Sequence, residues 1–164
     1  MLQIEDTQTS VKNATTGVFE LGDVHRIEVD KPDLISSAQS TFDLIKIGAE
    51  RKPEALALSF FLRTEDFTRP TTWTHSAWLA RIIQAANAFR QLGLSRDDVV
   101  AFILPNLPET HWVIWGGEAA GIIFAINPLL ESAAMKELMI AARPKILVTL
   151  APIPGSDLWE KASD

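Results

Sequence analysis

The stretch Val99-Val-Ala-Phe-Ile-Leu104, followed directly by Pro105-Asn-Leu-Pro108, decides the fold class of this chain. An unbroken apolar run of this length is typical of a strand that is covered on both faces of a sheet. The two prolines predict a turn and then a helix with Pro108 in its first position. A buried strand that leads straight into a helix is the beginning of a strand–helix–strand unit.

The same alternation continues toward the end of the chain. After the Pro-Asn-Leu-Pro turn, the apolar pattern and the Gly and Pro breaks predict these elements: a helix from Glu109 to about Ala120, a strand over 122–126, a helix over 131–142, a strand over 146–149 and a helix over 157–161. Short links between such elements favour parallel strands joined by right-handed crossovers. We therefore expect an α/β fold with a mostly parallel sheet flanked by helices.

Upstream of Val99 the pattern predicts two helices and a hairpin. A short helix begins near Thr41 and ends near Arg51, before Pro53. Apolar and β-branched runs over 56–62 and 71–74 predict a hairpin with a long, charged loop. Thr74 suits the N-cap of the next helix, which Gly93 ends. Its apolar face follows helical spacing and comprises Trp78, Ile82, Ala85, Phe89 and Leu92.

The first 40 residues are the least regular part of the chain. Ser, Thr, Gln and Asn dominate Thr7 to Thr16, a composition that cannot offset the entropy of ordering. A weak alternation over His25–Val29 allows one short strand before Lys31–Pro32 breaks it. We expect residues 1–40 to form an irregular N-terminal arm and residues 41–164 to form the α/β unit.

Composition excludes several classes of protein. The 164 residues contain no cysteine, and 15 Lys and Arg against 21 Asp and Glu give a formal net charge of −6. The negative balance argues against nucleic-acid binding, which needs a basic face. The longest uncharged stretch, Ala119 to Leu130, is too short for a transmembrane segment. The N-terminus does not resemble a signal peptide. We therefore expect a cytoplasmic protein.

Self-contained catalytic motifs are lacking in the sequence. The three histidines have no metal-ligand spacing, and no Gly-x-Ser-x-Gly segment is present. Gly116 and Gly121 have the spacing of a phosphate loop, but Ile122–Ile123 stand where Lys and Ser or Thr are needed. We interpret these glycines as sites of tight helix–sheet packing, and Asp97–Asp98 as turn residues. No catalytic, cofactor-binding or metal-binding residue is predicted.

One group of residues has a favourable position for binding. Asn106, His111, Trp112 and Trp115 follow the carboxyl end of the Val99–Leu104 strand. Ligands of open parallel sheets bind at this edge. Turn geometry alone also favours Asn, and apolar helix residues are commonly core. These four residues are therefore candidates for lining an acyl pocket or an interface.

The chain also carries an ordered series of segments that resembles a known family. The series comprises Trp73-Thr-His-Ser-Ala-Trp-Leu79, Ala86-Asn-Ala-Phe-Arg-Gln-Leu-Gly93, Asp97-Asp-Val-Val-Ala-Phe-Ile-Leu-Pro-Asn-Leu-Pro-Glu109, Ala120-Gly-Ile-Ile-Phe-Ala-Ile-Asn-Pro128 and Pro144-Lys-Ile-Leu-Val-Thr149. It is similar to the opening part of the AMP-forming adenylating enzymes, the superfamily of acyl-CoA synthetases, luciferases and peptide-synthetase adenylation domains. The resemblance implies the N-terminal subdomain of the large domain of an acyl-CoA synthetase.

The resemblance implies a two-step ligation in which a carboxylate and ATP give an acyl-adenylate, and a thiol then displaces AMP. ATP, Mg²⁺ and CoA are the implied cofactors of a full-length ligase acting in fatty acid metabolism. The family's Ser/Thr/Gly-rich phosphate loop has no counterpart in this sequence. We therefore expect residues 41–164 to be truncated before that loop. The chain should be inactive alone and should pair with the C-terminal remainder of the same enzyme.

Two other interpretations stay open. The chain could be a stand-alone, non-catalytic α/β module that self-associates or holds a partner, since an incomplete domain exposes apolar surface that favours a homo-oligomer. It could also be a flavodoxin-like nucleotide-binding protein. For the latter, Pro105-Asn-Leu-Pro108 is a poor phosphate cradle, because its two prolines have no backbone donor.

Overall fold

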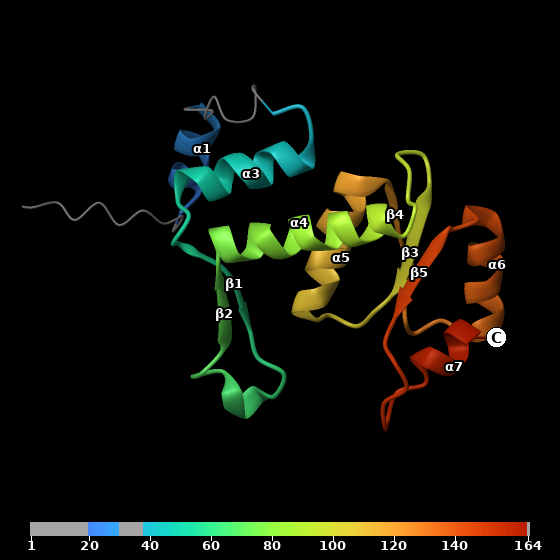
Figure 1. Ribbon diagram of the computed structural model, residues 1–164. Helices are drawn as coiled ribbons and strands as arrows, with labels where there is room; N and C mark the ends of the chain where they lie inside the picture. The colour runs from blue at the N-terminus through green and yellow to red at the C-terminus, as the bar shows by residue number, and fades with distance from the viewer. Residues whose placement is uncertain (1–19, 30–37, 164) are drawn as a thin grey trace, which may run out of the picture. The chain divides into compact units, whose positions relative to one another are not determined.

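A computed structural model describes residues 20–29 and 38–163 of the chain (Figure 1). The chain divides into two units, Met1–Ser37 and Ala38–Asp164. Within the first unit the structure describes one helix, α1 (Leu21–Val29). The short strand that the sequence allowed at His25–Val29 is therefore wrong. Asp23 lies in the first helical turn, and its carboxylate accepts a 2.6 Å hydrogen bond from Arg26, an i,i+3 pair that stabilises a helix.

The second unit is built around a three-stranded parallel sheet. Its strands are β3 (Val99–Ile103), β4 (Ile122–Ala125) and β5 (Ile146–Thr149), in the order β4-β3-β5. The predicted parallel α/β fold is confirmed. Because β3 is the central strand and carries only apolar residues, four of its five residues are fully buried. This explains the unbroken apolar run that identified it.

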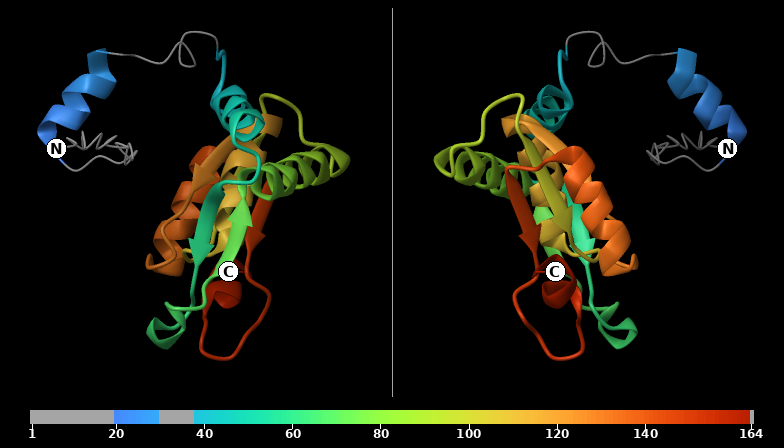
Figure 2. Two further views of the ribbon diagram at one scale, coloured as in Figure 1. Left: turned by 90° about the vertical axis from the view of Figure 1, so that its left-hand side faces the viewer. Right: turned by 90° about the vertical axis from the view of Figure 1, so that its right-hand side faces the viewer.

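Helices cover both faces of this sheet (Figures 1 and 2). On one face lie α4 (His75–Gln91) and α5 (Pro108–Ala120), which pack on Val100 and its neighbours. On the other face lie α6 (Ser132–Ala142) and α7 (Leu158–Ser163), which pack on Ala101. The side chains of successive strand residues alternate between these faces, as the pleat of a strand requires. The sheet is thus the middle of three layers.

The predicted hairpin and its neighbouring helices are present. Strand β1 (Leu56–Phe60) pairs in antiparallel fashion with β2 (Thr71–Thr74), and the 3₁₀ helix η1 (Thr64–Asp66) lies in the loop between them. Helix α3 (Thr41–Arg51) precedes the hairpin. Strand β1 is shorter than expected because the register ends at the pair Phe60 and Thr71. Phe61 and Leu62 therefore lie in the loop, 48% and 76% exposed.

Helix α4 begins and ends at the residues that the sequence indicated. The Thr74 hydroxyl accepts a 3.2 Å hydrogen bond from the backbone N–H of Ala77, as an N-cap does. Gly93 follows the helix with φ of 85°, a left-handed conformation that glycine adopts without strain. Leu92, which was assigned to the apolar face, is instead exposed because the helix ends at Gln91.

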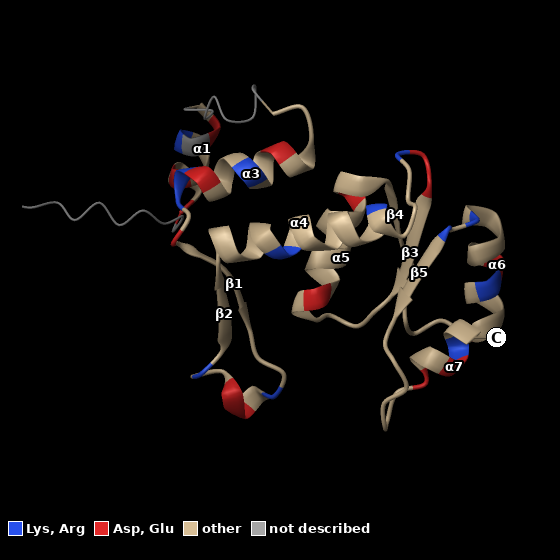
Figure 3. Cartoon of the chain, in the orientation of Figure 1, with Lys and Arg blue, Asp and Glu red and all other residues tan. Residues whose placement is uncertain are grey.

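In the part of the chain that the structure describes, charged residues lie on helices, turns and loops, whereas β3, β4 and β5 carry none (Figure 3). Two of the charges connect the amino ends of neighbouring strands. Lys145, just before β5, donates hydrogen bonds of 2.8 Å to Asp98 Oδ2 and 2.7 Å to the Gly93 carbonyl. Among residues 20–29 and 38–163, no helix is both long and apolar enough to cross a bilayer.

Candidate functional site

The candidate site begins in the turn at the carboxyl end of β3. Leu104 is buried, Pro105 is half-buried and Asn106 is exposed at the tip of the turn. Helix α5 follows directly, with Pro108 at its first position as the sequence predicts. The turn therefore presents the Asn106 side chain to solvent at the edge of the sheet where ligands of parallel sheets bind.

Thr110 holds this turn together from inside the helix. Its side-chain hydroxyl donates a 2.6 Å hydrogen bond to the Pro105 carbonyl and accepts a 3.4 Å hydrogen bond from the Leu107 N–H. Thr110 is buried, unusually for a polar residue, and both of these bonds close the turn on itself. Sequence reasoning missed Thr110. The available signal was its place at the third position of a helix, where a side chain can bond back to the N-cap N–H.

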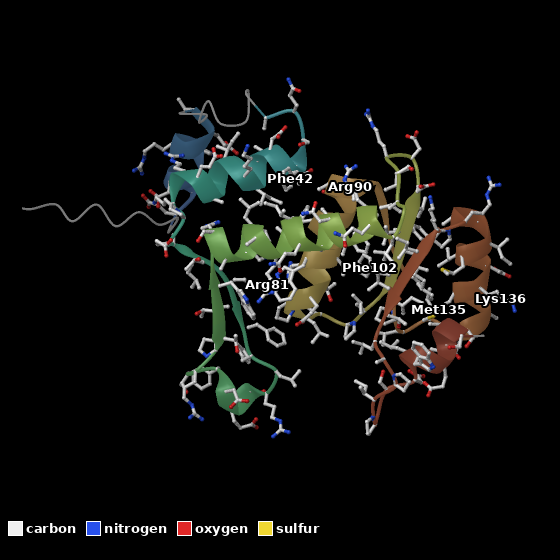
Figure 4. The ribbon with its side chains drawn as sticks, in the orientation of Figure 1. Phe42, Arg81, Arg90, Phe102, Met135 and Lys136 are labelled. Carbon is white, nitrogen blue, oxygen red and sulfur yellow. The ribbon has the colours of Figure 1, made fainter. Side chains whose placement is uncertain are left out.

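Trp112 joins three elements. Its ring lies 5.9 Å, centroid to centroid and edge-to-face, from that of Trp73 on β2. Arg81 projects from α4 (labelled in Figure 4). Its guanidinium carbon lies 5.7 Å from the centroid of the Trp112 ring. Edge-to-face aromatic pairs and guanidinium–indole contacts are both attractive. Trp112 therefore packs at the junction of the hairpin with α4 and α5, a contact that the sequence did not reveal.

The four candidate residues differ in exposure and in their contacts. Asn106 is exposed in the turn, whereas His111 and Trp115 are half-buried on α5. The indole nitrogens of Trp112 and Trp115 are buried, and neither has a hydrogen-bond partner within residues 20–29 and 38–163. Within the described part of the chain, the ring contacts of Trp112 are with neighbouring elements of the same unit.

Gly116 in α5 and Gly121, just after the end of that helix, serve packing. A Cβ atom on Gly116 would lie 2.7 Å from the Ala85 Cβ and 2.9 Å from the Ile82 carbonyl oxygen, both on α4. A Cβ on Gly121 would lie 2.7 Å from the Asp98 carbonyl oxygen. These distances support packing over phosphate binding. The contact at Gly116 is helix against helix, however, and not helix against sheet as expected.

Asp98 is a structural turn residue. Its carboxylate accepts hydrogen bonds from the Lys145 ammonium and from the Ser95 backbone N–H, at 2.8 and 2.7 Å. The hydrogen bond from Lys145, followed by that from Ser95, holds the pKa of Asp98 below its ordinary value. The Asp98 carboxylate thus connects its own turn at Ser95 with the segment that precedes β5. These bonds support the prediction that Asp98 is a turn residue.

The described residues do not suit a nucleotide with its metal ion. In the part of the chain that the structure describes, no group of three or more His, Asp or Glu could hold a metal. The turn after β3 contains Pro105 and Pro108, which have no N–H, and the N–H of Leu107 already bonds to Thr110. A phosphate cradle needs several convergent backbone N–H donors. We therefore derive no catalytic step on ATP or Mg²⁺ from these residues.

Comparison with known proteins identifies the family. The family model of the AMP-binding enzymes matches residues 45–163. Marinolic acid–CoA ligase of Pseudoalteromonas sp. (strain SANK 73390) is 33% identical over 147 residues, which are 88% of this chain and 22% of that protein. Acetyl-coenzyme A synthetase of Mycobacterium tuberculosis is 34% identical over 79 residues, 48% of this chain and 12% of the synthetase.

Solved structures show the same fold at lower identity. The N-terminal subdomain of Klebsiella oxytoca NpsA, in complex with 3-hydroxybenzoyl-AMSN, superposes with a TM-score of 0.60 at 18% identity, over 73% of this chain and 29% of that chain. Mycobacterium tuberculosis fatty acyl CoA synthetase superposes with a TM-score of 0.57 at 18% identity, over 71% and 22% of the two chains.

The fold is thus the α/β class shared with these solved structures. The chain belongs to the AMP-binding enzyme family, as the resemblance implied. It spans about a fifth of the length of the marinolic acid–CoA ligase that it matches.

Proposed function

We propose that this chain is the N-terminal part of an AMP-forming carboxylate–CoA ligase. Such an enzyme first joins a carboxylate to AMP and then transfers the acyl group to the thiol of CoA. The alignment of 88% of the chain with a CoA ligase carries the proposal. The substrate class that we propose is a fatty or aromatic acid. A cytoplasmic location accords with the use of ATP and CoA.

In this proposal the chain supplies scaffold, and the remainder of the enzyme supplies most of the chemistry. The parallel sheet and its four helices form a rigid flank, on which the turn after β3 is fixed by Thr110. ATP, Mg²⁺ and CoA would act with residues outside this flank, because its turn offers few donors for phosphate. The partner of this chain is therefore the remainder of the same ligase, and the chain alone is inactive.

The candidate residues have different roles within this proposal. Asn106 is exposed at the carboxyl edge of the sheet, so it and the half-buried His111 would line the acyl pocket or the interface with the remainder. Trp112 already packs against Trp73 and Arg81, so it would support the residues that line the acyl pocket or the interface. Trp115, with a buried indole nitrogen, would also lie behind the surface.

The proposal is tested by ATP–pyrophosphate exchange. The purified 164-residue chain should show no exchange with acetate, hexanoate, palmitate, benzoate or 4-coumarate. A longer product of the same gene, or the chain mixed with a separately expressed remainder, should show exchange with one of these acids. Exchange by the chain alone would contradict the assignment of the chemistry to the remainder. A longer product that folds and forms no adenylate with any acid would contradict the ligase assignment.

A second candidate, a non-catalytic module that self-associates, is favoured by one observation. Several large apolar side chains are exposed on different elements, among them Leu129 at 85% and Leu62 at 76%. Association with partners or copies would require such side chains to form one contiguous patch. Light scattering on a size-exclusion column distinguishes the two: a defined dimer at micromolar concentration favours the module, whereas a monomer that binds the ligase remainder favours the ligase.

A further inference from the structure

The exposed side chain of Arg81 on α4 is restrained by two neighbours (labelled in Figure 4). Its guanidinium contacts the ring of Trp112, which is itself held by the edge-to-face contact with Trp73. Its Nη1 donates a 3.0 Å hydrogen bond to Gln84 Oε1, one turn further along α4. A side chain that is already restrained loses less conformational entropy when it binds a partner.

Helix α4 carries positive charge only. Its two charged residues are Arg81 and Arg90, and Figure 3 shows no acidic residue along the helix. Arg90 donates a 3.1 Å hydrogen bond to a backbone carbonyl near the C-terminal end of α5, where a cation is favourable. Within the described part of the chain, no salt bridge joins Arg81 to an acid, including Glu109 and Glu118 on the neighbouring α5.

The guanidinium of Arg81 has donors to spare. An arginine side chain has five N–H groups in a planar fork, and Gln84 takes one of them at Nη1. The Nε and Nη2 groups together match the two oxygens of a carboxylate. The complement of this side chain is therefore an Asp or Glu side chain.

The surroundings of Arg81 indicate that this acid belongs to a protein segment. Arginine and tryptophan are the residues that most often dominate the binding energy of protein interfaces. Trp73 and Trp112 are half-buried, so they offer apolar surface beside the charge. The chain spans 22% of the CoA ligase that it matches, so a ligase of this kind has a long remainder that can supply the segment.

We propose that Arg81, with Trp73 and Trp112 beside it, is a docking point for the remainder of the ligase. A segment of the remainder places an Asp or Glu carboxylate on Nε and Nη2 of Arg81 and covers the two indole rings. This inference rests on the proposed function, because it takes the partner from it. It adds the surface that the partner covers and the charge that the partner supplies.

Arginine labelling tests whether the remainder covers Arg81. Phenylglyoxal, followed by peptide mass spectrometry, should label Arg81 readily in the 164-residue chain and at least tenfold more slowly in a longer, folded product of the same gene. Arg96, exposed in the turn before β3, is the control and should be labelled at the same rate in both proteins. Equal labelling rates of Arg81 in the two proteins overturn the proposal.

Two substitutions test whether the contact is ionic. Arg81→Met keeps an apolar stem beside Trp112 and removes the charge. It should raise the equilibrium constant for unfolding about tenfold more in the longer product than in the 164-residue chain, as expected for loss of a charge-assisted hydrogen bond. Arg81→Lys keeps the charge and should lose less, whereas the control Arg96→Met should act equally in both proteins. An Arg81→Met effect of the same size in both proteins overturns the proposal.

These measurements do not depend on catalysis, so they separate the docking point from the ligase assignment. A longer product that protects Arg81 but forms no adenylate supports the docking point and contradicts the ligase assignment. An active ligase that leaves Arg81 as reactive as in the 164-residue chain contradicts the docking point alone.

Discussion

The two faces of the sheet are packed differently, and the difference separates a rigid layer from an adaptable one. On the α4–α5 face, the helices approach so closely at Gly116 that a single Cβ atom has no room. On the α6–α7 face, Met135 and Met139 line a cavity of about 120 Å³. Methionine side chains are flexible and fill irregular space, whereas backbone contacts cannot adjust. The first face is suited to fixing the turn after β3, and the second can adjust its packing.

Substitution of Gly116 should break the rigid face and have the largest effect. Gly116→Val inserts a branched side chain against the Ala85 Cβ and the Ile82 carbonyl, and should lower the free energy of unfolding by about 3 kcal/mol. Urea denaturation measures this. Gly48→Ala in α3 is the control: a Cβ there has no neighbour within 4 Å, so it should stabilise the protein by about 0.5–1 kcal/mol. A Gly116→Val variant as stable as the parent would mean that α4 and α5 can separate at no cost.

Thr110 tests whether the rigid face also fixes the turn. Thr110→Val keeps the shape of the side chain and removes both of its hydrogen bonds, so the free energy of unfolding should fall by about 1–2 kcal/mol. Amide hydrogen exchange at Leu107 should become faster in the variant. Thr110→Ser retains the hydroxyl and should keep slow exchange. Equal exchange rates in all three proteins would show that the turn is held by other contacts.

Met135 tests whether the α6–α7 face tolerates a substitution in its core. Met135→Leu conserves volume beside existing free space, so it should cost less than about 1 kcal/mol. Thermal unfolding of Met135→Leu and of Gly116→Val measures the loss of stability on each face. A loss for Met135→Leu as large as that for Gly116→Val would contradict the assignment of this face as the adaptable one.

The smallest effect is expected at the amino ends of β3 and β5. Because Lys145 lowers the pKa of Asp98 in the folded protein, the ionised carboxylate contributes stability above the unfolded pKa near 3.8. This contribution is lost as the pH falls through the folded value. Asp98→Asn should therefore lower the urea midpoint at pH 7, and its effect should shrink as the pH falls through the lowered pKa of Asp98. Asp97→Asn is the control, and a pH-independent effect of Asp98→Asn would contradict the linkage.

Much of the fold was predictable because its signals are local. Pro108 marks the beginning of α5, and Gly93 follows the end of α4. The run Val99–Leu104 contains no charged residue. The alternation at His25–Val29 was misleading because a run of five residues also fits a helix. The i,i+3 pair of Asp23 and Arg26 adds a small stabilisation to that helix.

The candidate site was less predictable because it depends on how elements cross. The turn at Asn106 follows from two prolines, and its position at the carboxyl edge follows from the parallel sheet. The contacts of Trp112 with Trp73 and Arg81 depend instead on the angle between helices and hairpin. The cavity is space left over after packing, and no sequence pattern encodes it.

The pair formed by Trp73 and Trp112 has a spectroscopic consequence. The chain contains five tryptophans and no tyrosine, so its near-ultraviolet absorption and its intrinsic fluorescence come almost entirely from indole. Two indoles 5.9 Å apart at an interplanar angle of 75° couple their electronic transitions and give a paired circular dichroism band. That band reports the docking of the hairpin on α5 without any added label, and Trp73→Phe would remove it.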